Sequence, residues 1–272
     1  MKPRPSFPAR LAPLGPAGAT VARRAASAAD ASSAHQPARG TPIAGALPAR
    51  GGQMPAPVHD YGAVRRDMVH RLMRSGMDDA TVLSAMGTIE RHRFVDGALH
   101  AQAYQETSLP IGLGQTISKP AVVARMIALL RQGASGRLGR VLEIGTGCGY
   151  QAAVLSLIAS EVYSVERLRG LHERARENLR TLRLPNVHLL FGDGMLGYRK
   201  GAPYAGIIAA AGGGDVPAAW TEQLAIGGRL VAPVAGLKGA GQAIVVIERS
   251  RKGLQQTLHE AVHFVPLKSG VA

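Results

Sequence analysis

The sequence predicts a doubly wound α/β fold with a mostly parallel sheet, N-terminal helices and a disordered N-terminal tail. Apolar strand patterns alternate with helical patterns after Gly139, and two amphipathic helical patterns come before them. Residues 1–57 are rich in Pro, Ala, Gly, Ser and Arg, with Phe7 as the only aromatic residue and Asp30 as the only acid. Such a segment buries too little apolar area to offset its ordering entropy. We therefore expect a tail over 1–57 and a single domain over 58–272.

The domain should open with helices. Apolar residues recur at helical spacing over 64–73 and again over 82–89, and Asp78 or Asp79 is a suitable cap for the second helix. Residues 101–119 are loop-rich. A third helix should begin at Pro120, since proline is well tolerated in the first helical turn.

From residue 141 onward the chain should alternate between strands and helices. The expected helices span 151–159, 168–182 and 220–224. The expected strands span 141–144, 162–165, 188–191, 207–210, 229–233, 243–248 and 263–267. This alternation predicts a parallel sheet covered by helices, with ligands bound beyond the carboxyl ends of its strands.

Composition narrows the class of protein. The formal net charge is +14, but the arginines are scattered and no basic stretch is interleaved with aromatics, so we expect no nucleic-acid site. No apolar run reaches about 18 residues, which argues against a membrane span, and prolines interrupt the N-terminus where a secretory signal would need an apolar core. The single cysteine, Cys148, fits a cytoplasmic protein. The histidine spacing predicts no metal site.

A glycine-rich turn is the strongest local motif. The run VLEIGTGCGY over 141–150 is a strand that ends in glycines 145, 147 and 149 and leads into a helix. Glycines let backbone approach a ligand closely. The spacing differs from the dinucleotide fingerprint, whose helix N-terminus holds a pyrophosphate, so a nucleoside ligand without phosphate is indicated. A purely structural turn is the alternative.

Two acids follow successive strands. Glu166 follows the strand over 162–165 and can accept both hydroxyls of a ribose, or it can act as a helix cap. Asp193 lies in a Gly-Asp-Gly turn after the next strand and can accept from an adenine amino group, or it can be an ordinary turn residue. Together with the glycine turn they favour a ligand site.

Several motifs in matching order resemble the protein-L-isoaspartate O-methyltransferase family. The most specific is PIGLGQTISKP over 110–120. RHRFV over 91–95, the glycine turn, the Gly-Asp-Gly turn, Ala-Pro-Tyr over 202–204, the stretch 223–231 and FVPL over 264–267 also match, so that the likeness covers about 60–268. The resemblance implies a Rossmann-like methyltransferase sheet.

The resemblance also implies the chemistry. A free carboxylate of an L-isoaspartyl or D-aspartyl residue in a damaged protein attacks the methyl group of S-adenosyl-L-methionine, and the ester later closes to a succinimide. Ser118 is implied as the catalytic residue, although a lone serine before Pro120 is also a plausible helix cap. The implied cofactor contacts are Thr116, Ile117, Glu143, Gly145, Thr146, Gly147, Gly149, Glu166, Asp193, Gly194 and Gln242. The implied partners are damaged proteins and peptides, bound by a monomer.

This chain departs from the family in two places. Ala205 stands where an aspartate is usual, and residues 211–215 are glycine-rich where alanines are usual. Cys148 replaces a common serine and should be a packing residue. Two other functions stay open: a class I methyltransferase with a small-molecule or nucleic-acid acceptor, and a non-catalytic binding module that works through its basic tail.

Overall fold

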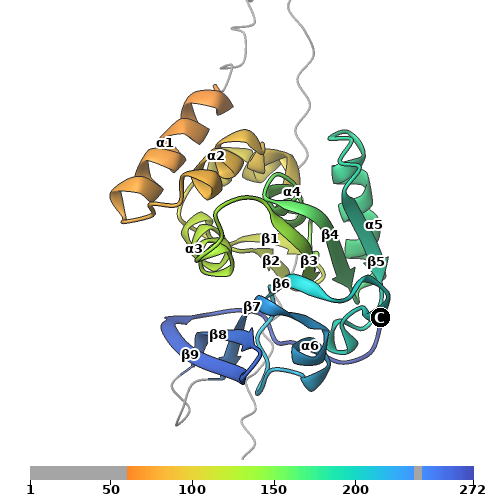
Figure 1. Cartoon of the computed structure of the whole chain (residues 1–272). Helices are drawn as coiled ribbons and strands as arrows, with labels where there is room; N and C mark the ends of the chain where they lie inside the picture. Colours follow the sequence, from red (N-terminus) through yellow and green to blue (C-terminus); the bar gives the residue numbers. More distant parts are fainter. Residues whose placement is uncertain (1–59, 236–240) are drawn as a thin grey trace, which may run out of the picture. The chain divides into compact units, whose positions relative to one another are not determined.

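The computed structural model describes residues 60–235 and 241–272, and Figure 1 shows their arrangement. The tail expected over 1–57 lies outside the described residues. A seven-stranded sheet has the order β5-β4-β3-β6-β7-β8-β9, and its first five strands in that order run parallel. This confirms the predicted α/β class.

The domain begins with two capped helices. In α1 (Tyr61–Arg74) the Asp60 side chain accepts from Ala63 N, and in α2 (Ala80–Thr88) the Asp79 side chain accepts from Thr81 N and Val82 N. The second of the two candidate caps is therefore the one used. Two 3₁₀ segments follow, η1 (Arg91–Phe94) and η2 (Gly97–Gln102). No helix in the described part of the chain is both long and apolar enough to cross a bilayer.

The stretch expected to be loop contains a small sheet. Strands β1 (Leu109–Gly112) and β2 (Gln115–Ile117) pair antiparallel. They are short and carry little apolar alternation, so the sequence pattern did not reveal them. Helix α3 (Pro120–Arg131) then begins at the proline, as predicted.

The parallel strands match the predicted positions. They are β3 (Leu138–Ile144), β4 (Ala159–Glu166), β5 (Val187–Phe191), β6 (Tyr204–Ala209) and β7 (Leu224–Ala235). They alternate with α4 (Tyr150–Ser156), α5 (Arg169–Arg180), η3 (Gly194–Leu196), η4 (Arg199–Gly201) and α6 (Ala218–Gln223). Helix α4 ends before residue 159, the end expected for it.

The sheet ends in an antiparallel hairpin, where one prediction was wrong. Strand β8 (Gln242–Ser250) covers the expected 243–248, but its partner is β9 (Gly253–Val262) rather than 263–267. Most of β9 is exposed and polar, so it lacks the apolar pattern that identifies a buried strand. Residues 263–267 contribute only an isolated bridge, from Pro266 to Gly212.

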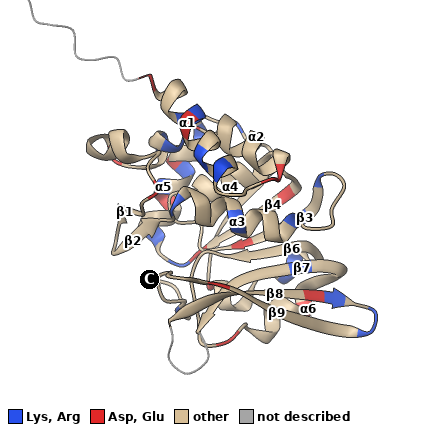
Figure 2. Ribbon diagram, turned by 90° about the vertical axis from the view of Figure 1, so that its left-hand side faces the viewer, with Lys and Arg blue, Asp and Glu red and all other residues tan. Residues whose placement is uncertain are grey.

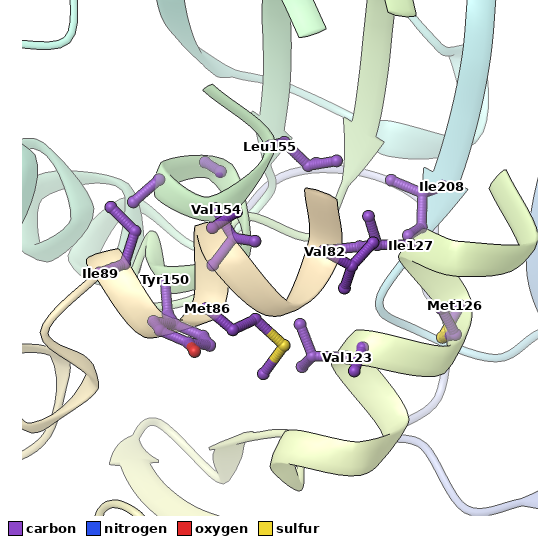
Figure 3. Packing of buried hydrophobic residues seen from close by; sticks show 14 of the residues in the cluster. Val82, Met86, Ile89, Val123, Met126, Ile127, Tyr150, Val154, Leu155 and Ile208 are labelled. Atoms are coloured by element: carbon purple, nitrogen blue, oxygen red, sulfur yellow. The ribbon is translucent and has the colours of Figure 1, made fainter. Parts of the chain in front are cut away.

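Two hydrophobic cores hold the layers together. The larger core packs α1 to α5 on one face of the sheet, and the smaller packs α6 on the other around Trp220 and Tyr204. Figure 1 shows α1 to α4 above the sheet and α6 below it. Figure 3 shows Val82 and Met86 of α2 packed against Val123 of α3 and Val154 of α4. Burying aliphatic side chains of this size contributes about 1.5–3 kcal/mol each.

Candidate active site

A cavity of about 420 Å³ lies at the carboxyl ends of β3 and β4. Its lining comes from the β1–β2 hairpin with the residue after it, one residue of α3, the turn between β3 and α4, the tip of β4 with the start of α5, Gly194, residues 210–211 and residues 265–268. Strand order reverses between β3 and β6, which makes this edge the topological switch point. Open α/β sheets bind ligands there.

The glycine turn has a backbone that other residues adopt poorly. Gly145, Gly147 and Gly149 have φ of 90°, 56° and 90°. A Cβ on Gly147 would lie 3.2 Å from Ile111 Cδ1, and one on Gly149 would lie 3.1 Å from Leu179 Cδ1. The glycines therefore serve the turn itself and also leave backbone bare along the cavity wall.

Glu166 joins this turn to the tip of β4. Its side chain lines the cavity, and its two carboxylate oxygens accept from Gly147 N and Leu168 N, each at 2.9 Å. The N-cap position of α5 is Leu168, so Glu166 stabilises the approach to the helix rather than the cap itself. Each carboxylate oxygen has a second lone pair available for a ligand hydroxyl.

Glu143 lies fully buried behind the glycine turn rather than on the cavity wall. One carboxyl oxygen accepts from the Ser164 hydroxyl, which is 2.6 Å from the Thr146 hydroxyl, while Oε1 has no hydrogen-bond partner among the described residues. Burial raises the pKa of Glu143 to about 8, against the lowering effect of the bond from Ser164. The carboxyl is therefore largely protonated at pH 7. Thr146 connects this buried group to the cavity.

The hairpin brings the predicted catalytic residue to the same cavity. Thr116, Ile117 and Ser118 all line it. The N-cap of α3 is Lys119, which makes no side-chain capping bond, and the free Ala121 N donates instead to the Glu106 carboxylate at 3.1–3.2 Å. The Ser118 hydroxyl makes no hydrogen bond within the described residues. The alternative of a helix cap is not observed, and the hydroxyl is available to a ligand.

Besides Glu143, three predicted cofactor contacts lie off the cavity wall: Gly149, Asp193 and Gln242. The Asp193 carboxylate accepts from Met195 N at 2.9 Å and from Gly270 N at 2.6 Å, and Gln242 Oε1 accepts from Phe264 N at 2.7 Å. Gly194 does line the cavity. Roles for Asp193 and Gln242 in cofactor binding therefore remain predictions.

Some residues that line the cavity were not predicted from the sequence. Tyr150 and Gln151 at the start of α4, Ile111 in β1 and Lys268 near the C-terminus also line the cavity. Tyr150 is the last residue of the glycine-turn motif, and that motif was a signal for it. Nothing local indicates that residues 265–268 reach the cavity. Cys148 is buried, and burial raises the pKa of its thiol, which suits a packing residue.

Comparison with known proteins identifies the family. A family model described as Protein-L-isoaspartate(D-aspartate) O-methyltransferase matches residues 63–272. A protein-L-isoaspartate O-methyltransferase from Methylibium petroleiphilum is 52% identical over 273 residues, 99% of this chain and 97% of the relative. One from Leptothrix cholodnii is 57% identical over 215 residues, 78% of this chain and 76% of the relative.

Solved structures of similar proteins agree with this family assignment. A protein-L-isoaspartate O-methyltransferase superposes with a TM-score of 0.68 at 27% identity, over 76% of this chain and 67% of the other. A putative enzyme of this kind from Plasmodium falciparum, in complex with S-adenosyl-L-homocysteine, has the same fold, with a TM-score of 0.64 at 22% identity over 75% of this chain and 98% of the other. The chain therefore belongs to the protein-L-isoaspartate(D-aspartate) O-methyltransferase family.

Proposed function

We propose that this chain transfers a methyl group from S-adenosyl-L-methionine to the free carboxylate of L-isoaspartyl and D-aspartyl residues in damaged proteins. A new carboxylate O–CH₃ bond forms as the methyl–sulfur bond breaks, which leaves a methyl ester and S-adenosylhomocysteine. The observation that carries the proposal is the Ser118 hydroxyl, which has no hydrogen-bond partner in the described part of the chain and lies on the wall of the cavity that Glu166 and the glycine turn also line.

The residues present fit this cofactor. Bare backbone at the glycine turn, the Glu166 carboxylate and apolar side chains such as Leu171 make a wall suited to a nucleoside with hydroxyls and no phosphate. The cationic side chains among the lining residues are Arg167 and Lys268. Glu166 would hold the ribose. The rest of the cofactor would lie near β3, against Gly145, Thr146, Gly147 and Gly149. When bound, the cofactor supplies an electrophilic sulfonium methyl.

The methyl-accepting carboxylate needs a hydrogen-bond donor to hold it but no general base. A carboxylate is already ionised at pH 7, so no proton must be removed before attack. The Ser118 hydroxyl donates to one acceptor oxygen and holds the other toward the methyl group. Positioning two reactants in this way lowers a barrier by as much as about 7–11 kcal/mol.

We propose further that the enzyme is a cytoplasmic monomer that acts on proteins and peptides and binds neither nucleic acid nor membranes. Basic segments lie on several parts of the fold with acidic segments between them, as Figure 2 shows. Arginines 125, 131, 174 and 229 form ion pairs with Glu260, Asp79, Asp96 and Glu248. This distribution supports a structural use for much of the positive charge.

A methyl-acceptance assay tests the function. Labelled cofactor is supplied with an isoaspartyl peptide, with the same peptide carrying normal aspartate, and with tRNA. We expect base-labile methyl esters on the isoaspartyl peptide alone. Label on tRNA, or equal label on both peptides, would favour a methyltransferase with another acceptor, and no label on any acceptor would favour a binding module.

A further inference from the structure

Arg91 is a buried cation that donates a hydrogen bond to the backbone of the candidate active site. Its side chain is fully buried at the start of η1. Nε donates to the Ala103 carbonyl at 2.6 Å, and Nη2 donates to the Ser118 carbonyl at 2.7 Å. Residues 91 and 118 are far apart in sequence, so this bond exists only in the folded protein.

The way in which Arg91 is paired is unusual. Burying a guanidinium costs free energy, which a nearby carboxylate commonly offsets. Arg131, a second buried arginine, follows that pattern, with Nε 2.9 Å from the Asp79 carboxylate. Arg91 makes no ion pair among the described residues, and it donates hydrogen bonds to two main-chain carbonyls. Arginine stays protonated in proteins, so these carbonyls receive charge-assisted bonds.

The Ser118 carbonyl lies in a short connection. Strand β2 ends at Ile117 and helix α3 begins at Pro120, both of them buried. Between them, the bond from Arg91 fixes the plane of the peptide that follows Ser118. The direction of the Ser118 side chain depends on that backbone, so Arg91 sets where the hydroxyl points without touching it.

The same guanidinium also contacts the other side of the cavity. It lies over the Tyr150 ring at 4.8 Å from the centroid, and Tyr150 directly follows the last glycine of the turn. One buried cation therefore contacts both the segment that carries Ser118 and the segment that carries the glycine turn.

We propose that Arg91 is a positioning residue for methyl transfer, which fixes the Ser118 peptide so that the hydroxyl meets the acceptor carboxylate. This inference rests on the proposed function. It also gives a role to Arg91 as the first residue of the 91–95 motif, although the Arg91 side chain does not line the cavity.

The experiment compares Arg91→Met and Arg91→Lys with Arg131→Met and Arg131→Lys. Arg131 is a matched control, because it is buried and hydrogen-bonded but does not line the cavity. Each variant is assayed with isoaspartyl peptide and saturating cofactor at a temperature where circular dichroism shows it folded. We expect kcat/KM to fall about 10–100-fold for Arg91→Met and less for Arg91→Lys, which keeps a donor. The Arg131 variants should stay within about threefold of wild type while losing thermal stability.

A double-mutant cycle separates positioning from general damage. Because Arg91 acts through Ser118, adding Arg91→Lys or Arg91→Met to Ser118→Ala should lower kcat/KM by less than about threefold. An equal fall with and without the Ser118 hydroxyl, or equal falls for the Arg131 and Arg91 variants, would overturn the inference. If Arg91→Met does not fold, the Arg91→Lys cycle decides alone. Failure of wild-type protein to methylate the peptide would instead refute the proposed function.

Discussion

Individual residues in the active site perform different electrostatic tasks. Glu166, almost fully buried, has both oxygens engaged by backbone N–H groups, whereas Glu143 behind the turn has one oxygen without a partner among the described residues. Ser118 presents a hydroxyl that nothing else in the described chain uses. The site thus combines a buried carboxylate held by backbone N–H groups, a buried protonated acid and, among the described residues, a free hydroxyl donor.

Replacing Ser118 tests the acceptor contact. Ser118→Ala should lower kcat/KM for an isoaspartyl peptide about 10–100-fold, because one hydrogen bond to a charged group is lost. Cofactor affinity, measured by calorimetry, should change much less. Ser108→Ala, at an exposed serine that does not line the cavity, serves as the control. Full turnover by Ser118→Ala would remove Ser118 from the mechanism.

The raised pKa of Glu143 predicts that the stability of the protein depends on pH. Its folded-state pKa of about 8 lies above the ordinary value of 4.5, so the folded protein retains a proton that the unfolded chain releases. The free energy of unfolding should therefore fall as pH rises from about 4.5 to 8, by up to about 1.4 kcal/mol per pH unit. Glu143→Gln has no such proton to lose. Urea unfolding of both proteins at several pH values should give curves that diverge, and parallel curves would contradict the assignment.

At the scale of elements, residues 263–272 form a strap across the carboxyl ends of three strands. Val265 O accepts from Gly212 N beyond β6, Gly270 N donates to Asp193 beyond β5, and the backbone of Ala272 pairs with Arg167 and Arg169 beyond β4. A Cβ on Gly212 would lie 2.4 Å from the Gln242 amide. The glycine at 212 therefore leaves room for the Gln242 amide, which accepts from Phe264 N of the strap, beside the point where Val265 docks.

Shortening this strap should loosen the cofactor site. Deleting residues 269–272 removes the bonds from Gly270 and Ala272, which anchor the cavity wall at 265–268. We expect the dissociation constant for S-adenosylhomocysteine to rise about 2–10-fold in calorimetry, since each bond is worth about 0.5–1.5 kcal/mol. Lys268→Ala in the full chain controls for loss of a charge at the wall. An unchanged constant would show that the wall is held without these bonds.

At the scale of the whole molecule, the described residues hold both the cores and the cavity. The matched family region, 63–272, begins close to the first helix. The cavity draws on segments from the β1–β2 hairpin through to the strap, so the catalytic unit needs nearly all of this region.

Removal of residues 1–57 should leave the enzyme intact. If the tail adds no core contacts, the truncated chain should melt within about 2 °C of the full chain, because surface changes cost about 0.5 kcal/mol or less. Its kcat/KM for an isoaspartyl peptide should be unchanged. A drop of more than about 5 °C, or a clear loss of turnover, would show that the tail packs on the domain.

Features that depend on neighbouring residues could be predicted from the sequence. A cap at Asp78 or Asp79, the helix start at Pro120, the glycine turn and the positions of the parallel strands were all predictable, because caps, turns and apolar periodicity are local signals. Together with the family motifs they predicted the fold, the cofactor and Ser118.

The complete fold, and no local pattern, sets how distant segments meet. It placed the β1–β2 hairpin and residues 265–268 on one cavity wall, paired exposed β9 with β8, and brought Arg91 to the Ser118 carbonyl. It also turned the Asp193 carboxylate toward Gly270. These contacts join residues separated by long stretches of chain, and their free energy depends on packing and burial that no local pattern encodes.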